Sequence, residues 1–330
     1  MKNPTNTPAR NPGTDRDTTS YTRSLAEYEA LAKGGALVDR GPRAVLGLAG
    51  KDPVGMLNAI LTNEVPEEDG IGAYAALLDP KGRIQTDLRV LKSGENILID
   101  TEPEGAEAAR GILGRYAPFS RVRLQELSDW SVLGLYGPRA KGLLGGLELA
   151  EHETAGMELG GVTVLVAGVA VPVPGFDLLG PADALLEARE HLLRNGATAA
   201  GHDAYETARV EAAVPRFGAD MTPENFPAEA GVLDRAVDFT KGCYPGQETV
   251  ARMHYRGHPN RTLQRFVVEG PPPAPDAEIS QDGKRVGKIT SVAPLPVDGH
   301  TFALGYLHRK ADPDTPLDAG EAKLRLHASG

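Results

Sequence analysis

Hydrophobic positions along this chain recur with two different spacings, one typical of strands and one typical of helices. Apolar or alternating runs at residues 44–50, 73–79, 83–91 and 97–100 predict strands, and the Pro-Lys-Gly turn at 80–82 predicts a hairpin between two of them. Residues 52–61 have helical spacing with Asp52 at the N-cap position, and a second helix is predicted at 103–115. Two more strands are predicted at 121–127 and 131–136.

A second block with the same character starts after Pro138. It predicts strands at 162–170 and 175–180 and helices at 182–196 and 204–213, followed by an irregular stretch rich in Pro, Gly and Asp up to residue 242. A long irregular segment inside a compact body is usually functional. After the Pro run at 270–278 the strands are short and predict a small β-barrel.

These patterns predict three regions in an α+β protein. Residues 1–19 are polar and predict a disordered tail, which ends before a helical stretch at about 25–31. Residues 20–262 form the α+β body, and residues 263–330 form the barrel. A length of 330 residues fits this division.

Composition and charge argue against two classes of function, binding of duplex nucleic acid and insertion into a membrane. The net charge of -10 argues against a duplex-binding surface, and the apolar runs are too short for a membrane span. One local basic cluster favours a small anion or a solvated strand face (Arg252, His254, Arg256, His258 and Arg261). One cysteine cannot form an internal disulfide, and no signal peptide is visible, so a cytoplasmic location is expected.

That single cysteine, Cys243, lies in a loop interrupted by Gly and Pro and follows Lys241. It could be a buried small hydrophobic residue or an accessible thiol activated by a nearby cation. His254 or His258 could serve as a base for a nucleophilic thiol, but no orienting Asn or Asp is identifiable. A zinc site needs several nitrogen or sulfur ligands at characteristic spacing, and one Cys with scattered His is a weak case. An iron–sulfur cluster usually takes four thiolates, so a chain with a single cysteine cannot hold a cluster alone.

The segment 241–248, Lys-Gly-Cys-Tyr-Pro-Gly-Gln-Glu, resembles the Lys-Gly-Cys-(Tyr/Phe)-x-Gly-Gln-Glu signature of the YgfZ-type folate-binding proteins. Residues 61–65, 77–90, 216–240, 251–258 and 287–291 are also similar to that family, and the likeness runs from about residue 24 to the end. The family is related to the glycine cleavage T-protein, an aminomethyltransferase. The resemblance implies an α+β, three-part cloverleaf around a folate channel and a C-terminal β-barrel. It also implies that the folate-binding body of residues 20–262 has two subdomains, with roughly 50–127 inserted in the rest, and that tetrahydrofolate or another folate is the cofactor.

The resemblance also implies site residues. Asp177, in Gly175-Phe176-Asp177, matches the carboxylate that grips the pterin ring and could accept two parallel hydrogen bonds. Arg209 matches an arginine that meets a folate carboxylate or orients Asp177, and Glu229 matches a loop glutamate. Lys241 and Tyr244 of the signature complete the implied cofactor-binding set.

The resemblance implies two candidate catalytic residues, Asp87 and Cys243. Asp87 matches the second member of an Asp-Asp pair whose first member here is Thr86, which questions intact aminomethyl transfer. T-proteins have no thiol at the position of Cys243, so the resemblance implies a different task for this thiol, which is expected at the mouth of the folate cavity.

Three hypotheses therefore stand. The leading one is a folate-binding accessory protein that supports iron–sulfur cluster assembly or repair and iron–sulfur-dependent tRNA modification through Cys243, with iron–sulfur client or assembly proteins as partners. The second is a tetrahydrofolate-dependent aminomethyl or one-carbon transferase, which rests on Asp87, Asp177 and Arg209. The third is an interaction module with a vestigial folate pocket.

Overall fold

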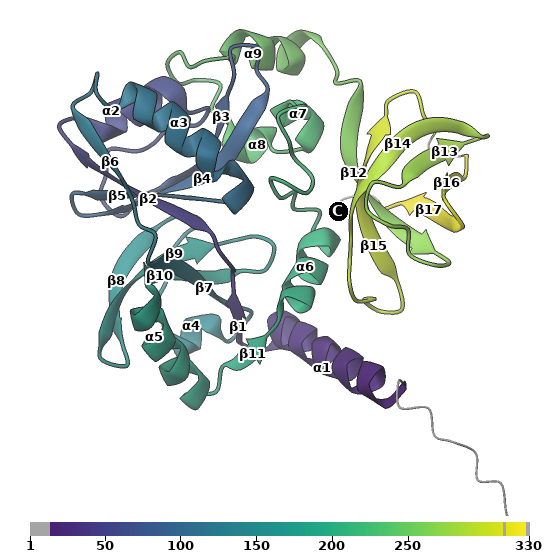
Figure 1. Cartoon of the computed structure of the whole chain (residues 1–330), viewed down its shortest axis with the longest axis horizontal. Helices are drawn as coiled ribbons and strands as arrows, with labels where there is room; N and C mark the ends of the chain where they lie inside the picture. The colour runs from purple at the N-terminus through teal and green to yellow at the C-terminus, as the bar shows by residue number, and fades with distance from the viewer. Residues whose placement is uncertain (1–13, 313–314, 328–330) are drawn as a thin grey trace, which may run out of the picture.

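The computed structural model describes residues 14–312 and 315–327, and it has two packed sheets followed by a separate closed barrel (Figure 1). The first sheet has the strand order β11-β1-β7-β10-β9-β8, and only β1 and β11 pair in parallel. Its strands are β1 (Ala36–Asp39), β7 (Trp130–Tyr136), β8 (Thr154–Leu159), β9 (Val162–Val169), β10 (Gly175–Pro181) and β11 (Thr198–Ala200). Its helices are α1 (Thr14–Lys33), α4 (Ala140–Leu143), α5 (Ala182–Arg194) and α6 (His202–Glu211).

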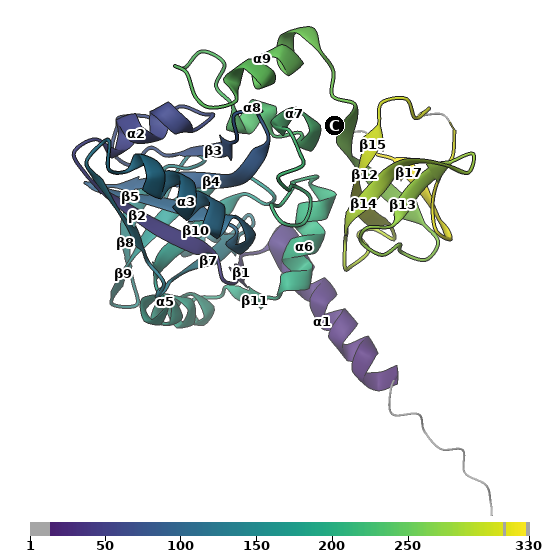
Figure 2. The same cartoon turned by 45° about the horizontal axis from the view of Figure 1, so that its top comes forward.

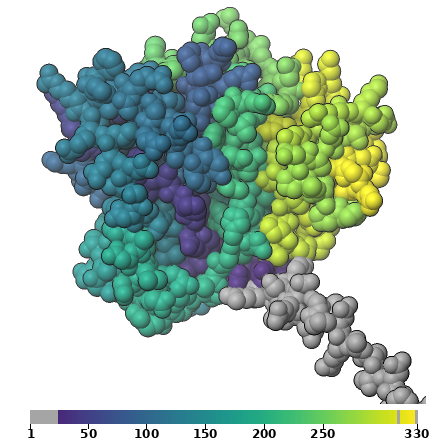
Figure 3. Space-filling view, in the orientation of Figure 1, coloured from purple at the N-terminus to yellow at the C-terminus, as the bar shows by residue number. Residues whose placement is uncertain are grey.

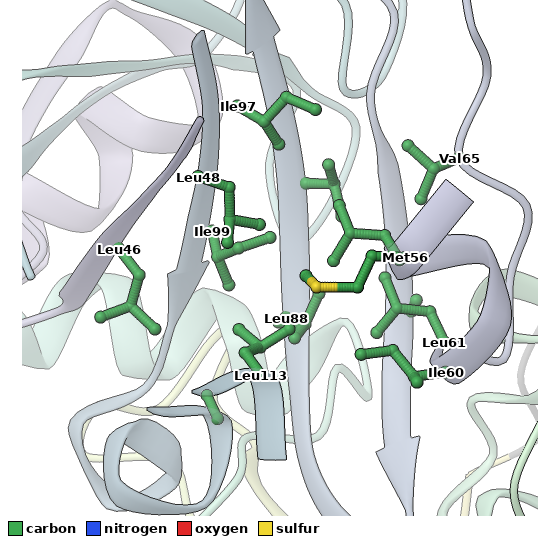
Figure 4. Close-up of a cluster of buried hydrophobic side chains, with 14 of the residues drawn as sticks. Leu46, Leu48, Met56, Ile60, Leu61, Val65, Leu88, Ile97, Ile99 and Leu113 are labelled. Atoms are coloured by element: carbon green, nitrogen blue, oxygen red, sulfur yellow. The ribbon is translucent and has the colours of Figure 1, made fainter. Parts of the chain in front are cut away.

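The second sheet interrupts the first, because the chain leaves the first sheet after β1 and returns to it with β7. Its order is β3-β4-β5-β2-β6. The strands are β2 (Ala44–Gly50), β3 (Ala73–Leu78), β4 (Ile84–Ser93), β5 (Asn96–Thr101) and β6 (Val122–Glu126), covered by α2 (Pro53–Ile60), η1 (Pro103–Gly105) and α3 (Ala106–Tyr116). Figure 4 shows Met56 of α2 and Leu88 of β4 in the shared core.

The two sheets pack against each other through a small apolar cluster. Val45 and Leu98 of the second sheet meet Val132 and Leu179 of the first. Burial of such side chains contributes roughly 1.5–3 kcal/mol each and fixes the relation of the two sheets.

The segment after α6 lies between the sheets and the barrel (Figures 2 and 3). It contains α7 (Pro227–Ala230), α8 (Leu233–Ala236) and α9 (Gln247–Arg256). The barrel closes in the order β12-β15-β14-β13-β16-β17, with β17 pairing back to β12. Its strands are β12 (Arg261–Glu269), β13 (Glu278–Gln281), β14 (Lys284–Val292), β15 (Thr301–His308), β16 (Leu317–Ala319) and β17 (Ala322–Leu326).

The α+β class and the C-terminal barrel are confirmed, while several local predictions need correction. Helix α1 begins at Thr14, so the predicted tail is wrong for residues 14–19, and residues 1–13 lie outside the described part. Helix α1 packs along α6 and β11, and such packing sustains helices that composition alone does not favour.

The inserted sheet already begins with β2 at residue 44, before the predicted limit of about 50. In the basic cluster after Cys243, Arg252, His254 and Arg256 lie on helix α9, and Arg261 begins strand β12, so the predicted strand face is wrong for most of the cluster. Among the described helices, none combines the length and the apolar character needed to cross a bilayer.

Candidate functional site

A polar cavity of about 110 Å³ opens where the two sheets meet α6 and α8. Charged side chains dominate its wall. They come from both sheets, from the loops before β2 and β8, from α6, and from the segment that follows α6 (Arg40, Arg43, Asp87, Arg89, Asp100, Glu102, Glu151, Asp177, Arg209, Arg216 and Arg235). Such a convergence of ionisable groups is typical of binding sites.

Asp177 is the most enclosed carboxylate of this cavity. Residues alternate along β10, so Phe176 packs in the apolar core while Asp177 points to the cavity wall, with 0% of its surface exposed. The Tyr136 hydroxyl donates to Asp177 Oδ1, Arg89 Nη2 lies 2.7 Å from Oδ2, and Arg40 Nη1 lies 3.4 Å from Oδ2. Burial alone would raise the pKa of Asp177, but Arg89 and Arg40 outweigh it and lower that pKa.

These contacts limit what Asp177 can still accept. A carboxylate has about four lone-pair sites, and Tyr136, Arg89 and Arg40 use three of them. About one site remains on Oδ1. The two parallel hydrogen bonds expected for a pterin therefore require one arginine to yield, and the long contact to Arg40 is the weakest of the three.

A second buried carboxylate, Asp100 on β5, holds the arginines in place. Arg43 Nε donates to Asp100 Oδ1 at 2.6 Å, and Arg89 Nε donates to Oδ2 at 2.8 Å. Arg43 also pairs with Glu102. The two arginines lower the pKa of Asp100 to about 2 against the effect of burial. Arg40, Arg43, Arg89 and Asp100 were not predicted from the sequence, although Asp100, a charged residue at the end of the apolar run 97–100, was a usable signal.

Asp87 lies on the same wall, on β4. The Tyr74 hydroxyl donates to Asp87 Oδ2 at 2.8 Å, and burial raises the pKa of Asp87 to about 6. Thr86 points the other way: its hydroxyl is fully buried, 2.9 Å from that of Thr101. Thr86 therefore cannot replace a second cavity carboxylate, which agrees with the doubt raised by the sequence.

The rim next to Asp87 is formed by His152, Glu151 and Arg235. Arg235 Nη2 donates to Glu151 Oε1 at 2.6 Å, and the Arg235 guanidinium lies 5.1 Å from the centre of the Tyr74 ring. His152 stacks on Tyr74 with 6.3 Å between ring centres, and its pKa is lowered to about 4, mainly by burial. The imidazole is therefore neutral at pH 7.

Arg209 lines the cavity, but its hydrogen bonds run elsewhere. It donates to Glu206 at 2.9 Å, to Asp220 Oδ2 at 2.6 Å and to Ser291 Oγ of the barrel at 2.9 Å. This network joins α6 to β14. Arg40 and Arg89, and not Arg209, contact Asp177. Folate binding by Arg209 stays a prediction.

Glu229, Lys241 and Tyr244 are not among the residues that line the cavity. Glu229 accepts from the Phe226 amide at the start of α7 and pairs with Arg261 at 3.4 Å. Tyr244 is buried among apolar residues beside β3 and β4. A role of these residues in folate binding stays a prediction, but in this structure they have structural contacts.

Lys241, Tyr244 and Gly246 hold the signature loop at three points. Lys241 Nζ donates to the main-chain carbonyls of Asn58, Leu61 and Asn63 at the end of α2. Gly246 has a φ of 82°, and a Cβ there would lie 2.6 Å from the Asp79 carbonyl oxygen in the β3–β4 turn. Only glycine fits this conformation and this close approach.

Cys243 lies between these anchors with its side chain exposed. Of the two alternatives for the thiol, the structure shows the accessible one. The expected position at the mouth of the folate cavity is not found, because Cys243 is not among the residues that line this cavity. Among the described residues no hydrogen bond joins it to His254 or His258, and His254 stacks instead on Phe239 with 4.1 Å between ring centres. The thiol and the cavity are therefore separate places on the protein.

One residue lies between the signature loop and the cavity rim. The Asn63 carbonyl accepts from Lys241, while its side-chain amide donates to the carbonyls of Tyr74 at 2.9 Å and Arg235 at 3.1 Å. Tyr74 and Arg235 both line the cavity.

A second cavity of about 650 Å³ lies on the other side of residues 169–175. Its wall is mainly apolar and includes Leu31, Ala32 and Phe176. It is larger than the first, but few polar groups converge in it. The charged cavity around Asp177 is therefore the better candidate for recognition of a polar heterocycle. Within the described residues no group of three or more His, Cys, Asp or Glu is arranged to hold a metal ion.

Comparisons with known proteins agree with this architecture. Residues 8–241 match the GCVT N-terminal domain, and residues 260–329 match the CAF17 C-terminal beta-barrel domain. The chain belongs to the GCVT N-terminal domain family, and within it the resemblance to YgfZ-type proteins related to aminomethyltransferases is confirmed.

Individual relatives support the same assignment, and a solved structure shares the fold. The tRNA-modifying protein YgfZ of Sodalis glossinidius (strain morsitans) is 28% identical over 282 residues, which are 83% of this chain and 85% of that protein. An aminomethyltransferase of Moorella thermoacetica is 26% identical over 301 residues, 87% of this chain and 82% of that protein. The crystal structure of glycine cleavage system aminomethyltransferase T from Bartonella henselae shares the fold, with a TM-score of 0.81 and 22% identity over 92% of this chain and 88% of that chain.

Proposed function

We propose that this protein is a folate-binding accessory protein whose central cavity takes the pterin ring of tetrahydrofolate or another folate. The observation that carries the proposal is Asp177, a fully buried carboxylate on the cavity wall that stays ionised between Arg89 and Arg40. An ionised carboxylate is the acceptor that the ring N–H and amino group of a pterin require.

The cavity is too small to take a folate without rearrangement of its side chains. A volume of about 110 Å³ is below the roughly 300 Å³ at which ligand pockets begin. The ion pairs of Arg40, Arg43 and Arg89 occupy the interior, and the Glu151–Arg235 pair crosses the rim. Binding of a folate therefore includes displacement of part of this network, with Arg40 and the rim pair as the weakest points.

Isothermal titration calorimetry with tetrahydrofolate tests the proposal. We expect saturable binding to the wild type and to Ala32→Trp, because this substitution adds bulk at an exposed position of the second cavity and leaves the charged cavity unchanged. Loss of binding in Ala32→Trp would assign the ligand to the second cavity. Absence of binding to the wild type would refute a folate function.

Cys243 supplies the second part of the proposal. An exposed thiol outside the ligand cavity suits reversible exchange with a partner protein. We infer that it supports iron–sulfur cluster assembly or repair, including the iron–sulfur enzymes of tRNA modification, in the reducing cytoplasm where a single thiol persists.

The thiol role is tested in a cell that lacks the endogenous protein. We expect Cys243→Ala to fold and bind folate like the wild type but to fail in restoring iron–sulfur enzyme activity. Thr240→Ala, in the same loop, serves as a control and is expected to restore that activity. Full activity of Cys243→Ala would refute the thiol role.

One observation favours the alternative, a tetrahydrofolate-dependent aminomethyl or one-carbon transferase. Asp87 lines the cavity with a pKa of about 6, which suits a general acid or base near neutral pH. Incubation with an aminomethylated carrier protein and tetrahydrofolate would yield methylenetetrahydrofolate in the wild type but not in Asp87→Asn. No product from the wild type would eliminate this function.

A further inference from the structure

Arg216 differs from the other arginines of the central cavity in how its charge is compensated. Arg43, Arg89, Arg209 and Arg235 each have a carboxylate oxygen within 2.7 Å, and Arg40 donates to the Tyr136 hydroxyl at 2.7 Å. The carboxylate oxygen that pairs with the Arg216 guanidinium is Glu206 Oε1, at 3.7 Å from Nε. That distance is too long for a hydrogen bond.

Glu206 is also already engaged. Arg209 donates to both of its oxygens, at 3.0 and 2.9 Å. Arg216 Nε is buried and has no hydrogen-bond partner among the described residues. A buried donor without a partner costs about 1–3 kcal/mol, so native proteins rarely keep one without a function.

The main chain at Arg216 is anchored by Asp220. Its amide donates to Asp220 Oδ2 at 3.1 Å, and its carbonyl accepts from the Asp220 amide at 2.8 Å. Asp220 is itself buried and bonded to Arg209. The side chain of Arg216 is 28% exposed, whereas that of Asp177 is 0% exposed, so Arg216 belongs to the outer part of the cavity.

We propose that Arg216 binds a carboxylate of the ligand at the outer part of the cavity and selects ligands that have an anionic tail. This inference rests on the proposed folate function and names the part of the ligand that Arg216 recognises. When Asp177 holds the ring, the glutamate of a folate extends outward and supplies carboxylates that a planar guanidinium can bind with two hydrogen bonds.

Two ligands that differ in the tail test the proposal. We would titrate tetrahydrofolate and 6-methyltetrahydropterin, which lacks the tail, into the wild type, Arg216→Gln and Arg115→Gln. Arg115 is exposed on α3 and does not line the cavity, so its variant controls for the loss of one positive charge. We expect Arg216→Gln to weaken tetrahydrofolate binding about tenfold and to leave the tail-less pterin unchanged.

The outcomes separate this inference from the function on which it rests. Equal weakening for both ligands, or no weakening for tetrahydrofolate, would overturn the role of Arg216 while folate binding stands. No binding of either ligand to the wild type would overturn both. If Arg216→Gln does not fold, Arg216→Lys serves in its place. Lysine keeps the positive charge but cannot donate two parallel hydrogen bonds, so we expect a smaller loss of affinity, limited to tetrahydrofolate. An unchanged tetrahydrofolate affinity in a folded lysine variant, together with an unchanged salt dependence, would overturn the proposal.

Discussion

Replacement of Asp87 by Asn should make the protein more stable at alkaline pH, although Asp87 has a good hydrogen bond. Burial raises its pKa from 3.8 to about 6 in the folded protein. A carboxyl group with a raised pKa stabilises the fold when it is protonated. That contribution is fully present below about 3.8 and is lost as the pH rises through 6.

The magnitude follows from the two pKa values. The interval between 3.8 and about 6, at about 1.4 kcal/mol per pH unit, corresponds to a cost of about 3 kcal/mol at pH 8. Asparagine cannot ionise, and its carbonyl oxygen can still accept from the Tyr74 hydroxyl. Since Asp87 is partly exposed to the cavity, we expect Asp87→Asn to gain about 1–3 kcal/mol in unfolding free energy at pH 8 and less than about 1 kcal/mol at pH 4.

Urea unfolding of both proteins at pH 4 and pH 8 measures this difference. Asp234→Asn, on the exposed side of α8, serves as a surface control and should change stability by no more than about 0.5 kcal/mol at either pH. A variant less stable than the wild type at pH 8, or a difference that is the same at both pH values, would refute the reasoning. A confirmed gain would show that the cavity keeps a destabilised carboxylate, as functional sites often do.

Three further predictions concern the signature loop and the barrel. Lys241→Met should lower the unfolding free energy by about 2 kcal/mol, because three carbonyls at the end of α2 lose their donor. Urea unfolding measures this change, and an unchanged urea midpoint would contradict the assigned contacts. Asp220→Asn should cost about 3 kcal/mol and speed limited proteolysis between the body and the barrel, because Arg209 loses a buried partner; an unaltered cleavage rate would speak against this joint. Cys243→Ser should alter stability by less than about 0.5 kcal/mol, and the native wild type should react with one equivalent of a thiol reagent, whereas a thiol that reacts only after unfolding would disprove its exposure.

The sequence was most informative where local chemistry decides the structure. The Asp52 cap, the 80–82 turn and the alternating runs predicted α2 and the β3–β4 hairpin within a few residues. The Gly and Pro residues around Cys243 indicated an accessible loop, and the thiol is exposed. In these places the neighbouring residues fix the backbone.

The sequence was less informative where distant segments meet. Arg40, Arg89 and Asp177 come from a loop and two different sheets, and no local pattern shows that their side chains converge. Lys241 and Tyr244 are close to Cys243 in sequence, yet their long side chains turn toward α2 and the β3–β4 hairpin and away from the cavity. The resemblance to a family supplied candidate site residues but did not show which of them line one cavity.

The most direct test of the central claim is the affinity of tetrahydrofolate for the wild type and for Asp177→Asn, measured by calorimetry, with each protein's fold checked by circular dichroism. Asparagine keeps the size of the side chain but removes the negative charge that accepts one or two hydrogen bonds from the pterin. A hydrogen bond to a charged group contributes about 1.5–3 kcal/mol. The account predicts a 10- to 100-fold weaker affinity in the variant, roughly as expected for the loss of one such bond. An affinity within about twofold of the wild type in a folded variant would contradict the assignment of the pterin to Asp177.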